Sequence, residues 1–320
     1  MAADLKRYVD LQVNGYVGID FNDPTTSVAQ LHSAADAMRR DGVVAALPTV
    51  ITGSAEAMTT CIRNLVHAIE QRPETADVFR GIHVEGPFLS PAEGYIGAHP
   101  RQHAKFQDLR LLEDLCRAGG PWIRMVTLAP EVDPGGKMVR FCRERNIIVA
   151  AGHTNASLDQ LECAIESGLS LFTHLGNGCP RVMDRHDNII FRALRLRERL
   201  RFTVIADGFH IPRLLFENLL DWIPTDRLAV VSDAISAAGL GPGVYQLAGR
   251  SVTIGPDRAC RDASGEHFVG SASRMCDADD WLRDTLGLPA RRRRQLLFAV
   301  AAAWMGWPVD SDSTMPLARR

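Results

Sequence analysis

The sequence lacks the features that mark several classes of protein. Its 7 cysteines are odd in number and none form a Cys-x-x-Cys pair, which argues against a zinc ribbon or a disulfide framework and for reduced thiols in a cytosol. No stretch approaches the roughly 20 apolar residues that span a bilayer. Residues 1–7 contain no apolar segment of the kind found in signal peptides. We therefore expect a cytoplasmic protein with no membrane partner.

The sequence also has no large excess of positive or negative charge. The formal net charge is −2, from 36 Lys and Arg against 38 Asp and Glu, so no overall positive field favours nucleic acid as a partner. The one dense basic cluster, Arg291–Arg294, is typical of the solvated face of a late helix. There is no Gly-x-Gly-x-x-Gly after the first expected strand, no Walker sequence and no Gly-x-Ser-x-Gly elbow, which disfavours an open nucleotide-binding sheet and a serine hydrolase.

What the sequence does contain is a series of eight short apolar runs, each ending in polar or glycine residues. Such runs predict buried parallel strands, and they cover Tyr8–Asn14, Val43–Val50, Phe79–Gly86, Ile123–Pro130, Ile147–His153, Ser170–Leu175, Phe202–Gly208 and Leu228–Ala234. Segments with helical spacing lie between them, at Ser27–Arg40, Ser54–Gln71, Leu109–Arg117, Gly136–Arg145, Leu158–Ser167, Phe191–Leu200 and Pro212–Asp221. Eight alternating units favour a (β/α)8 TIM-type barrel over a doubly wound open sheet.

The 320 residues suit one such barrel, which typically takes roughly 250 residues, with a modest addition. We predict a single catalytic domain over 1–305 and a tail over 306–320. After the eighth strand, a glycine-rich insertion at about 239–270 contains strand-like pieces at Val244–Leu247 and Ser251–Ile254. Two C-terminal helices are expected to follow, at about Ala272–Leu286 and Ala290–Trp304.

Polar side chains gather at the carboxyl ends of the predicted strands. In a barrel these ends meet on the face that carries active sites. The residues concerned are Gln12, Asn14, Glu85, His153, His174, Asp207, His210 and Asp233. Residues far apart in the chain are therefore expected to share one cavity.

Two histidines and a carboxylate suit a catalytic divalent metal with an open position for water. Glu85, His153 and His174 are the candidate ligands, and Asp233 is the candidate for moving a proton from that water to a leaving amine. A lone strand-end histidine is more often a structural hydrogen-bonding group, and Asp207 could equally hold its loop. His83 is left out of the set, because the expected strand register turns it to the other face.

Seven motifs in this order resemble those of the N-acetylglucosamine-6-phosphate deacetylases, a family of the amidohydrolase superfamily. They extend over about residues 10 to 275 and comprise Asp10–Gly15, His83–Leu89, Gly97–Pro100, Ala151–Ala156, Thr173–Leu175 with Asn177, Ile205–Gly208 with His210, and Val231–Ala234. The resemblance implies a hydrolase that removes the acetyl group from N-acetylglucosamine 6-phosphate or a related amino sugar.

The resemblance also implies roles for individual residues. Glu85, His153 and His174 become the ligands of one divalent ion, zinc or alternatively iron, manganese or cobalt, and Asp233 becomes the general base and acid. Gln12 and Asn14 replace the His-x-His of two-metal relatives, which favours a single ion. The implied substrate contacts are His99, Asn177, Gly178, Arg185 for the phosphate, and His210. A homodimer in which the neighbouring subunit supplies the phosphate-binding arginine is also implied.

The sequence departs from the family at three places. The strands that usually build a small β-sandwich before and after the barrel are expected to be absent or vestigial. Gly178-Cys179-Pro180 replaces the usual Ala-Met-Pro, and the segment after Arg185 begins His186-Asp187 where Glu-Pro-Gly is common. The last two changes touch the substrate end. Two alternatives therefore stay open: hydrolysis of a different amide, with or without a phosphate group, and a barrel that binds metal without catalysis.

Overall fold

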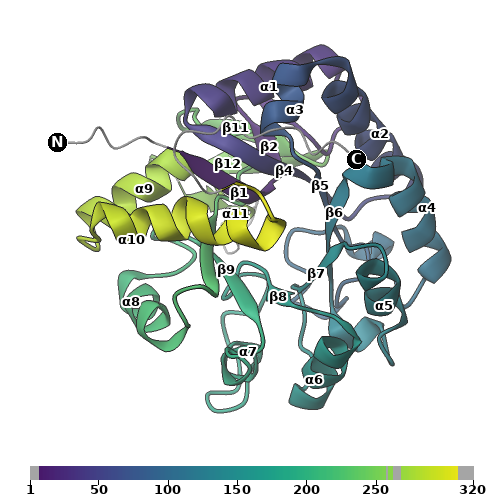
Figure 1. The fold of residues 1–320 in the computed structure, drawn as a ribbon, viewed down its shortest axis with the longest axis vertical. Coiled ribbons are helices and arrows are strands. Elements are labelled where there is room, and N and C mark those ends of the chain that lie inside the picture. The colour runs from purple at the N-terminus through teal and green to yellow at the C-terminus, as the bar shows by residue number, and fades with distance from the viewer. Residues whose placement is uncertain (1–6, 257–258, 262–267, 309–320) are drawn as a thin grey trace.

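The computed structural model describes residues 7–256, 259–261 and 268–308. Eight parallel strands form one sheet in the order β1-β4-β5-β6-β7-β8-β9-β10, and helices surround it (Figure 1). The strands are β1 (Tyr8–Val13), β4 (Val43–Ile51), β5 (Ile82–Glu85), β6 (Ile123–Leu128), β7 (Ile148–Ala151), β8 (Leu171–Phe172), β9 (Arg201–Ile205) and β10 (Leu228–Val231). The predicted TIM-type barrel is confirmed.

The barrel closes where its first strand meets its last. Gln12 O accepts a hydrogen bond from Asp233 N at 3.0 Å, and Asn14 N donates to Ala234 O at 2.6 Å. Between Asp10 and Val13 the register of β1 against β4 shifts. The seam between the first and the last strand therefore passes directly beside two predicted site residues, Gln12 and Asp233.

The predicted helices follow the strands with small shifts at their ends. They are α1 (Val28–Arg40), α2 (Ala55–Gln71), α3 (Pro73–Val78), α4 (Leu109–Gly119), α5 (Lys137–Arg143), α6 (Leu158–Ser167), α7 (Ile189–Arg195) and α8 (Arg213–Trp222). Serine side chains cap three of them: Ser27, Ser54 and Ser157 accept backbone hydrogen bonds from the first turns of α1, α2 and α6, which satisfies amide groups that the helix itself cannot.

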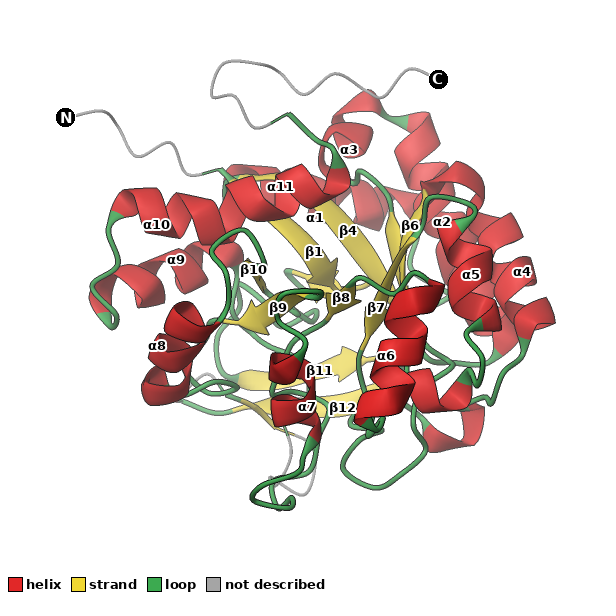
Figure 2. Cartoon of the chain, turned by 60° about the horizontal axis from the view of Figure 1, so that its bottom comes forward, coloured by secondary structure: helices red, strands yellow, loops and turns green. Residues whose placement is uncertain are grey.

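The C-terminal segment is helical, and its last turns, from residue 295 onward, cover one end of the barrel. Its elements are α9 (Met275–Asp284), α10 (Ala290–Arg294), a π-helical turn η4 (Gln295–Ala299) and α11 (Val300–Met305). Phe298, Ala301 and Ala302 pack against interior barrel residues such as Leu11 and Leu47. Figure 2 shows α10 and α11 at the end opposite the β11–β12 hairpin. Apolar residues thus close this end of the barrel.

Two small sheets lie outside the barrel. One pairs β2 (Gly15–Tyr16) with β3 (Ile19–Asp20), and the other has the order β11-β12-β13, with β11 (Gly243–Leu247), β12 (Arg250–Ile254) and β13 (Cys260–Arg261). The predicted hairpin after the eighth strand is therefore present. Parts of that insertion, 257–258 and 262–267, lie outside the described residues, as does 309–320 of the predicted tail. Within the described ranges, no helix is long and apolar enough to cross a membrane.

Replacing Phe298 with Ala tests the importance of the C-terminal cover. Phe298 is fully buried, and we expect its loss to lower the free energy of unfolding by about 3–5 kcal/mol because a cavity is left behind. The matched control is Phe191→Ala on α7, where the side chain is 48% exposed. Urea unfolding of both variants measures the difference; equal destabilisation would contradict the assignment.

Candidate active site

Four predicted residues stand at the carboxyl ends of four barrel strands. Glu85 is the last residue of β5, and His153, His174 and Asp233 each follow a strand end by two residues. His174 Nε2 lies 2.8 Å and His153 Nε2 3.5 Å from Glu85 Oε1. Asp233 lines the same cavity as Glu85 and His153. The structure thus brings these four residues together.

Three of these residues adopt the left-handed backbone conformation, with φ of 50° at His153, 33° at His174 and 48° at Asp233. For residues other than glycine this conformation costs on the order of 1–3 kcal/mol and persists only where the surroundings enforce it. Here His174 N donates to Thr203 Oγ1 at 2.9 Å, and Asp233 N donates to Gln12 O at 3.0 Å. Such strain is concentrated at functional sites.

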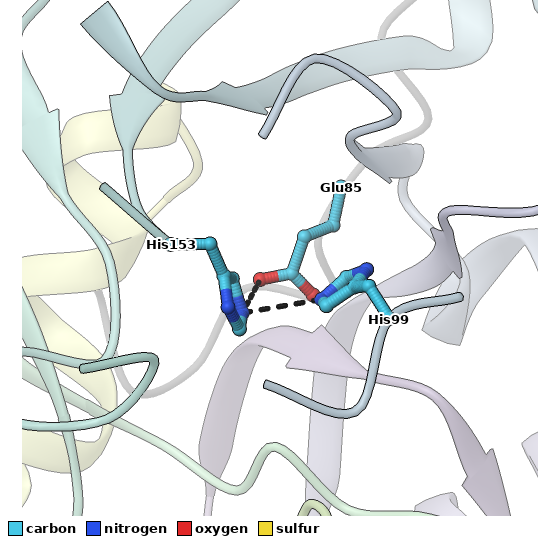
Figure 3. A group of neighbouring side chains, drawn as sticks. All are labelled: Glu85, His99 and His153. Carbon is cyan, nitrogen blue, oxygen red and sulfur yellow. Dashed lines mark hydrogen bonds and ion pairs between the residues drawn. The ribbon is translucent and has the colours of Figure 1, made fainter. Parts of the chain in front are cut away.

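His99 joins the cluster from the loop after β5. Its Nε2 lies 3.1 Å from His153 Nε2, and the ligand atoms of Glu85, His99 and His153 lie within 4.8 Å of one another (Figure 3). His153 Nδ1 lies 2.9 Å from the Tyr95 carbonyl oxygen, which can only accept, so Nδ1 carries the proton and Nε2 of the neutral ring keeps its lone pair. Two imidazole nitrogens facing each other beside a carboxylate suit a divalent cation.

The charges around Glu85 are tightly coupled. Burial raises the pKa of Glu85, but the neighbouring His153 and His174 side chains outweigh burial and hold that pKa well below its usual range. Burial lowers the pKa of His174, and the Glu85 carboxylate more than compensates, so the His174 pKa is raised. His174 Nδ1 is buried without a hydrogen-bond partner among the described residues. Glu85 is therefore an ionised acceptor that organises the donors around it.

Asp233 is held by two amides. Asn14 Nδ2 donates to Oδ1 at 2.8 Å and Asn177 Nδ2 to Oδ2 at 3.4 Å. Burial, reinforced by the negative charge of Glu85, raises the Asp233 pKa. The shared cavity measures about 40 Å³, enough for an ion or an ordered water. The carboxylate of Asp233 thus faces the space beside the His and Glu cluster.

Gln12 supports the cluster from β1. Its Nε2 lies 3.0 Å from both carboxylate oxygens of Glu85. Gln12 is only 1% exposed, so the amide acts inside the barrel, where each hydrogen bond to a charged group contributes about 1.5–3 kcal/mol.

Asp207 and His210 form a buried pair beside the cavity. His210 Nδ1 lies 2.7 Å from Asp207 Oδ2, and Asp207 Oδ1 also accepts from the backbone N–H groups of Phe209 and His210. Burial raises the Asp207 pKa, but the neighbouring His210 and these hydrogen bonds lower it to about 2. Within the described residues His210 Nε2 is buried and has no partner. Asp207 therefore holds the loop and orients His210.

The loop between β8 and α7 holds the other predicted substrate contacts. Asn177 lines the cavity. Gly178 has φ of 62°, and a Cβ there would lie 2.7 Å from His153 Nδ1, so this glycine packs against a candidate ligand. Arg185 is exposed in the same loop and is not part of the described lining of the cavity.

The face expected for His83 was wrong. Since side chains two residues apart in a strand share a face, His83 points into the barrel like Glu85. Its Nδ1 lies 3.1 Å from Leu11 O and its Nε2 2.8 Å from Thr127 Oγ1. Burial lowers its pKa to about 4. His83 is therefore a neutral group that connects β5 with β1 and β6, two residues before Glu85 in the strand.

No protein-family model matches the chain. The chain is similar, with 30% identity over 248 residues, to N-acetylglucosamine-6-phosphate deacetylase of Bacillus subtilis, covering 77% of this chain and 61% of that protein. It is similar, at 28% identity, to N-acetylgalactosamine-6-phosphate deacetylase of Escherichia coli O157:H7, over 88% of this chain and 71% of that protein.

A solved structure extends the likeness to the fold. N-acetylglucosamine-6-phosphate deacetylase of Pasteurella multocida superposes with a TM-score of 0.83 at 27% identity, over 94% of this chain and 76% of that one. In sequence and in fold the chain is therefore similar to N-acetylglucosamine-6-phosphate deacetylases. It spans about three fifths of the length of the Bacillus subtilis protein.

Replacing Gly178 with Ala tests how closely the loop supports His153. The new methyl group would meet the imidazole at 2.7 Å, so we expect metal binding to weaken measurably in addition to a stability loss of about 1 kcal/mol from the left-handed backbone. Gly287→Ala is the control: its φ is 65°, but nothing lies within 4 Å of the added atom. Thermal unfolding and metal titration separate the two effects; equal metal affinity in both variants would contradict this role.

Proposed function

We propose that this protein is a metal-dependent hydrolase that removes the acetyl group from an N-acetylated amino sugar 6-phosphate, with N-acetylglucosamine 6-phosphate as the first candidate. One observation carries the proposal: the buried Asp233 carboxylate faces the same small cavity as Glu85 and His153. The similarity to N-acetylglucosamine-6-phosphate and N-acetylgalactosamine-6-phosphate deacetylases adds the substrate class. The reaction would break the amide C–N bond and yield an amine and acetate.

Glu85, His153 and His174 would hold one divalent ion, and His99 lies close enough to take part. Nitrogen and carboxylate donors suit zinc, and iron, manganese or cobalt could occupy the same set. When bound, such an ion polarises the amide carbonyl and makes a neighbouring water more acidic. Asn14 and Asn177 orient the carboxylate that must act beside it.

Asp233 would serve as general base and then general acid. Its carboxylate takes a proton from the attacking water and returns that proton to the nitrogen of the leaving amine. The raised pKa of Asp233 makes it a stronger base than an exposed aspartate. Its left-handed backbone keeps the side chain turned into the cavity through both transfers.

The substrate would be held by groups around the cavity. His210 Nε2 is buried and available for a sugar hydroxyl, with Asp207 fixing the ring. Asn177 and Gly178 border the reacting group, and Arg185 would meet the phosphate, in a homodimer with help from the neighbouring subunit. We expect the protein to act in the cytoplasm on this small molecule alone.

Acetate release tests the activity and the base together. We expect the metal-loaded protein to release acetate from N-acetylglucosamine 6-phosphate faster than from N-acetylglucosamine. Asp233→Asn should reduce kcat by ~10²-fold or more, since general base catalysis contributes ~10²–10⁴-fold. A chelator should abolish turnover and added divalent metal restore it. No acetate from any N-acetylhexosamine, phosphorylated or not, would contradict the proposal.

Arg185→Ala tests the phosphate contact. The exposure of Arg185 favours a second candidate, an amidohydrolase for an unphosphorylated substrate. If Arg185 binds phosphate, the variant should show a KM for the phosphorylated sugar raised ~10-fold or more, because a bidentate Arg–phosphate pair is a strong contact. Its kcat should change little. An unchanged KM would favour the unphosphorylated amide; Arg181→Ala, an exposed arginine of the same loop, is the control.

A further inference from the structure

Gln12 lies in the middle of a chain of buried hydrogen bonds that crosses four barrel strands. Its Nε2 lies 3.0 Å from each Glu85 carboxylate oxygen, and its Oε1 lies 2.6 Å from Thr173 Oγ1. Thr173 Oγ1 is 3.1 Å from Thr203 Oγ1, which accepts from the backbone N–H of His174 at 2.9 Å. The chain therefore connects Glu85 with the backbone of His174.

The ionised carboxylate determines the direction of each of these hydrogen bonds. A carboxylate only accepts, so Gln12 must turn its NH₂ group to Glu85 and its carbonyl oxygen to Thr173. Thr173 must then donate its hydroxyl proton to Gln12. Because the single hydroxyl proton of Thr173 goes to Gln12, Thr173 can only accept in its contact with Thr203, and Thr203 is the donor there. The hydrogen bonds therefore all run in one direction, from Thr203 through Thr173 and Gln12 to Glu85.

We propose that Thr173 is a positioning residue of the metal site that acts through Gln12. This inference rests on the proposed metal-dependent function. With its oxygen held by Thr173, the Gln12 amide can present only its two N–H donors to Glu85. A flipped amide would place oxygen against carboxylate, which repel each other, and would displace Glu85. The threonine hydroxyl thus fixes the orientation of a candidate ligand that it does not touch.

Thr127 provides a natural comparison on β6. It is as fully buried as Thr173, and its Oγ1 lies 2.8 Å from His83 Nε2. This hydroxyl serves the neutral histidine below the cluster and is not in the chain from Thr203 to Glu85. Thr127→Val therefore removes a buried hydroxyl of the barrel interior without changing the Gln12 chain.

The experiment is titration of the full chain with Co²⁺ in competition with a chelator, together with the visible d–d absorption spectrum of the bound ion. We expect Thr173→Val to weaken Co²⁺ binding by ~10–100-fold, as loss of groups that orient a ligand commonly does, and to alter the spectrum. Thr173→Ser and Thr127→Val should remain near wild type in both. If Thr173→Val does not fold, Thr173→Ala removes the same hydroxyl without a methyl group beside Gln12.

A double-mutant cycle with Gln12→Leu separates positioning from a general structural role. If Thr173 acts through Gln12, adding Thr173→Val to Gln12→Leu should weaken Co²⁺ binding by less than ~3-fold, well below its effect alone. Wild-type affinity and spectrum in Thr173→Val, or an undiminished effect in the Gln12→Leu background, would overturn the inference.

These outcomes are distinct from those of the proposed function, because Co²⁺ binding is measured without substrate. If the wild-type protein deacetylates amino sugar phosphates but Thr173→Val binds Co²⁺ as wild type does, the positioning role alone is overturned. A protein with the expected Thr173 effect that releases no acetate overturns the proposed reaction alone. A wild-type protein that binds no Co²⁺ overturns both.

Discussion

The polar interior of the barrel is arranged around one buried carboxylate, that of Glu85, which is only 2% exposed. A lone ionised carboxylate in an apolar interior would be strongly unfavourable. In this barrel it receives contacts from His153, His174 and Gln12, which come from three other strands. The strands must therefore end at matching heights, and parallel closure of the sheet is what places them so.

The two axial ends of the barrel differ in composition: one is filled with apolar side chains and the other with polar ones. At the amino ends of the strands, Phe298 and the alanines of α11 fill the interior with apolar groups, so this end contributes stability. At the carboxyl ends the interior is polar, and the β11–β12 hairpin packs apolar residues such as Leu247 against Ile51 beside the cavity. Stability and chemistry are thereby separated along the barrel axis, as in other barrels of this kind.

The fold could be predicted from the sequence because buried parallel strands appear as continuous apolar runs, and all eight were found. Glu85, His153, His174 and Asp233 were predicted because each ends or follows such a run. His99 was assigned only as a substrate contact, since it lies in a loop whose path no periodicity reveals. The error at His83 came from the strand register: an alternation of two places it on the same face as Glu85.

Other parts of the site depend on information that a linear pattern does not carry. The left-handed backbone at His153, His174 and Asp233 contradicts the local preference of these residue types, and only contacts made after folding enforce it. The contact of Gly178 with His153 and the order of donors from Thr203 to Glu85 likewise appear only in three dimensions.

The seam between β1 and β10 has a consequence for how the protein acquires its shape. Asn14 and Asp233 meet although 219 positions separate them in the chain, so the pocket does not exist until the sheet has become a ring. Contacts of such long sequence separation form late and slowly. A cation that binds only the finished ring would stabilise that state by mass action. Metal supply during synthesis would then influence the yield of native protein as well as its turnover.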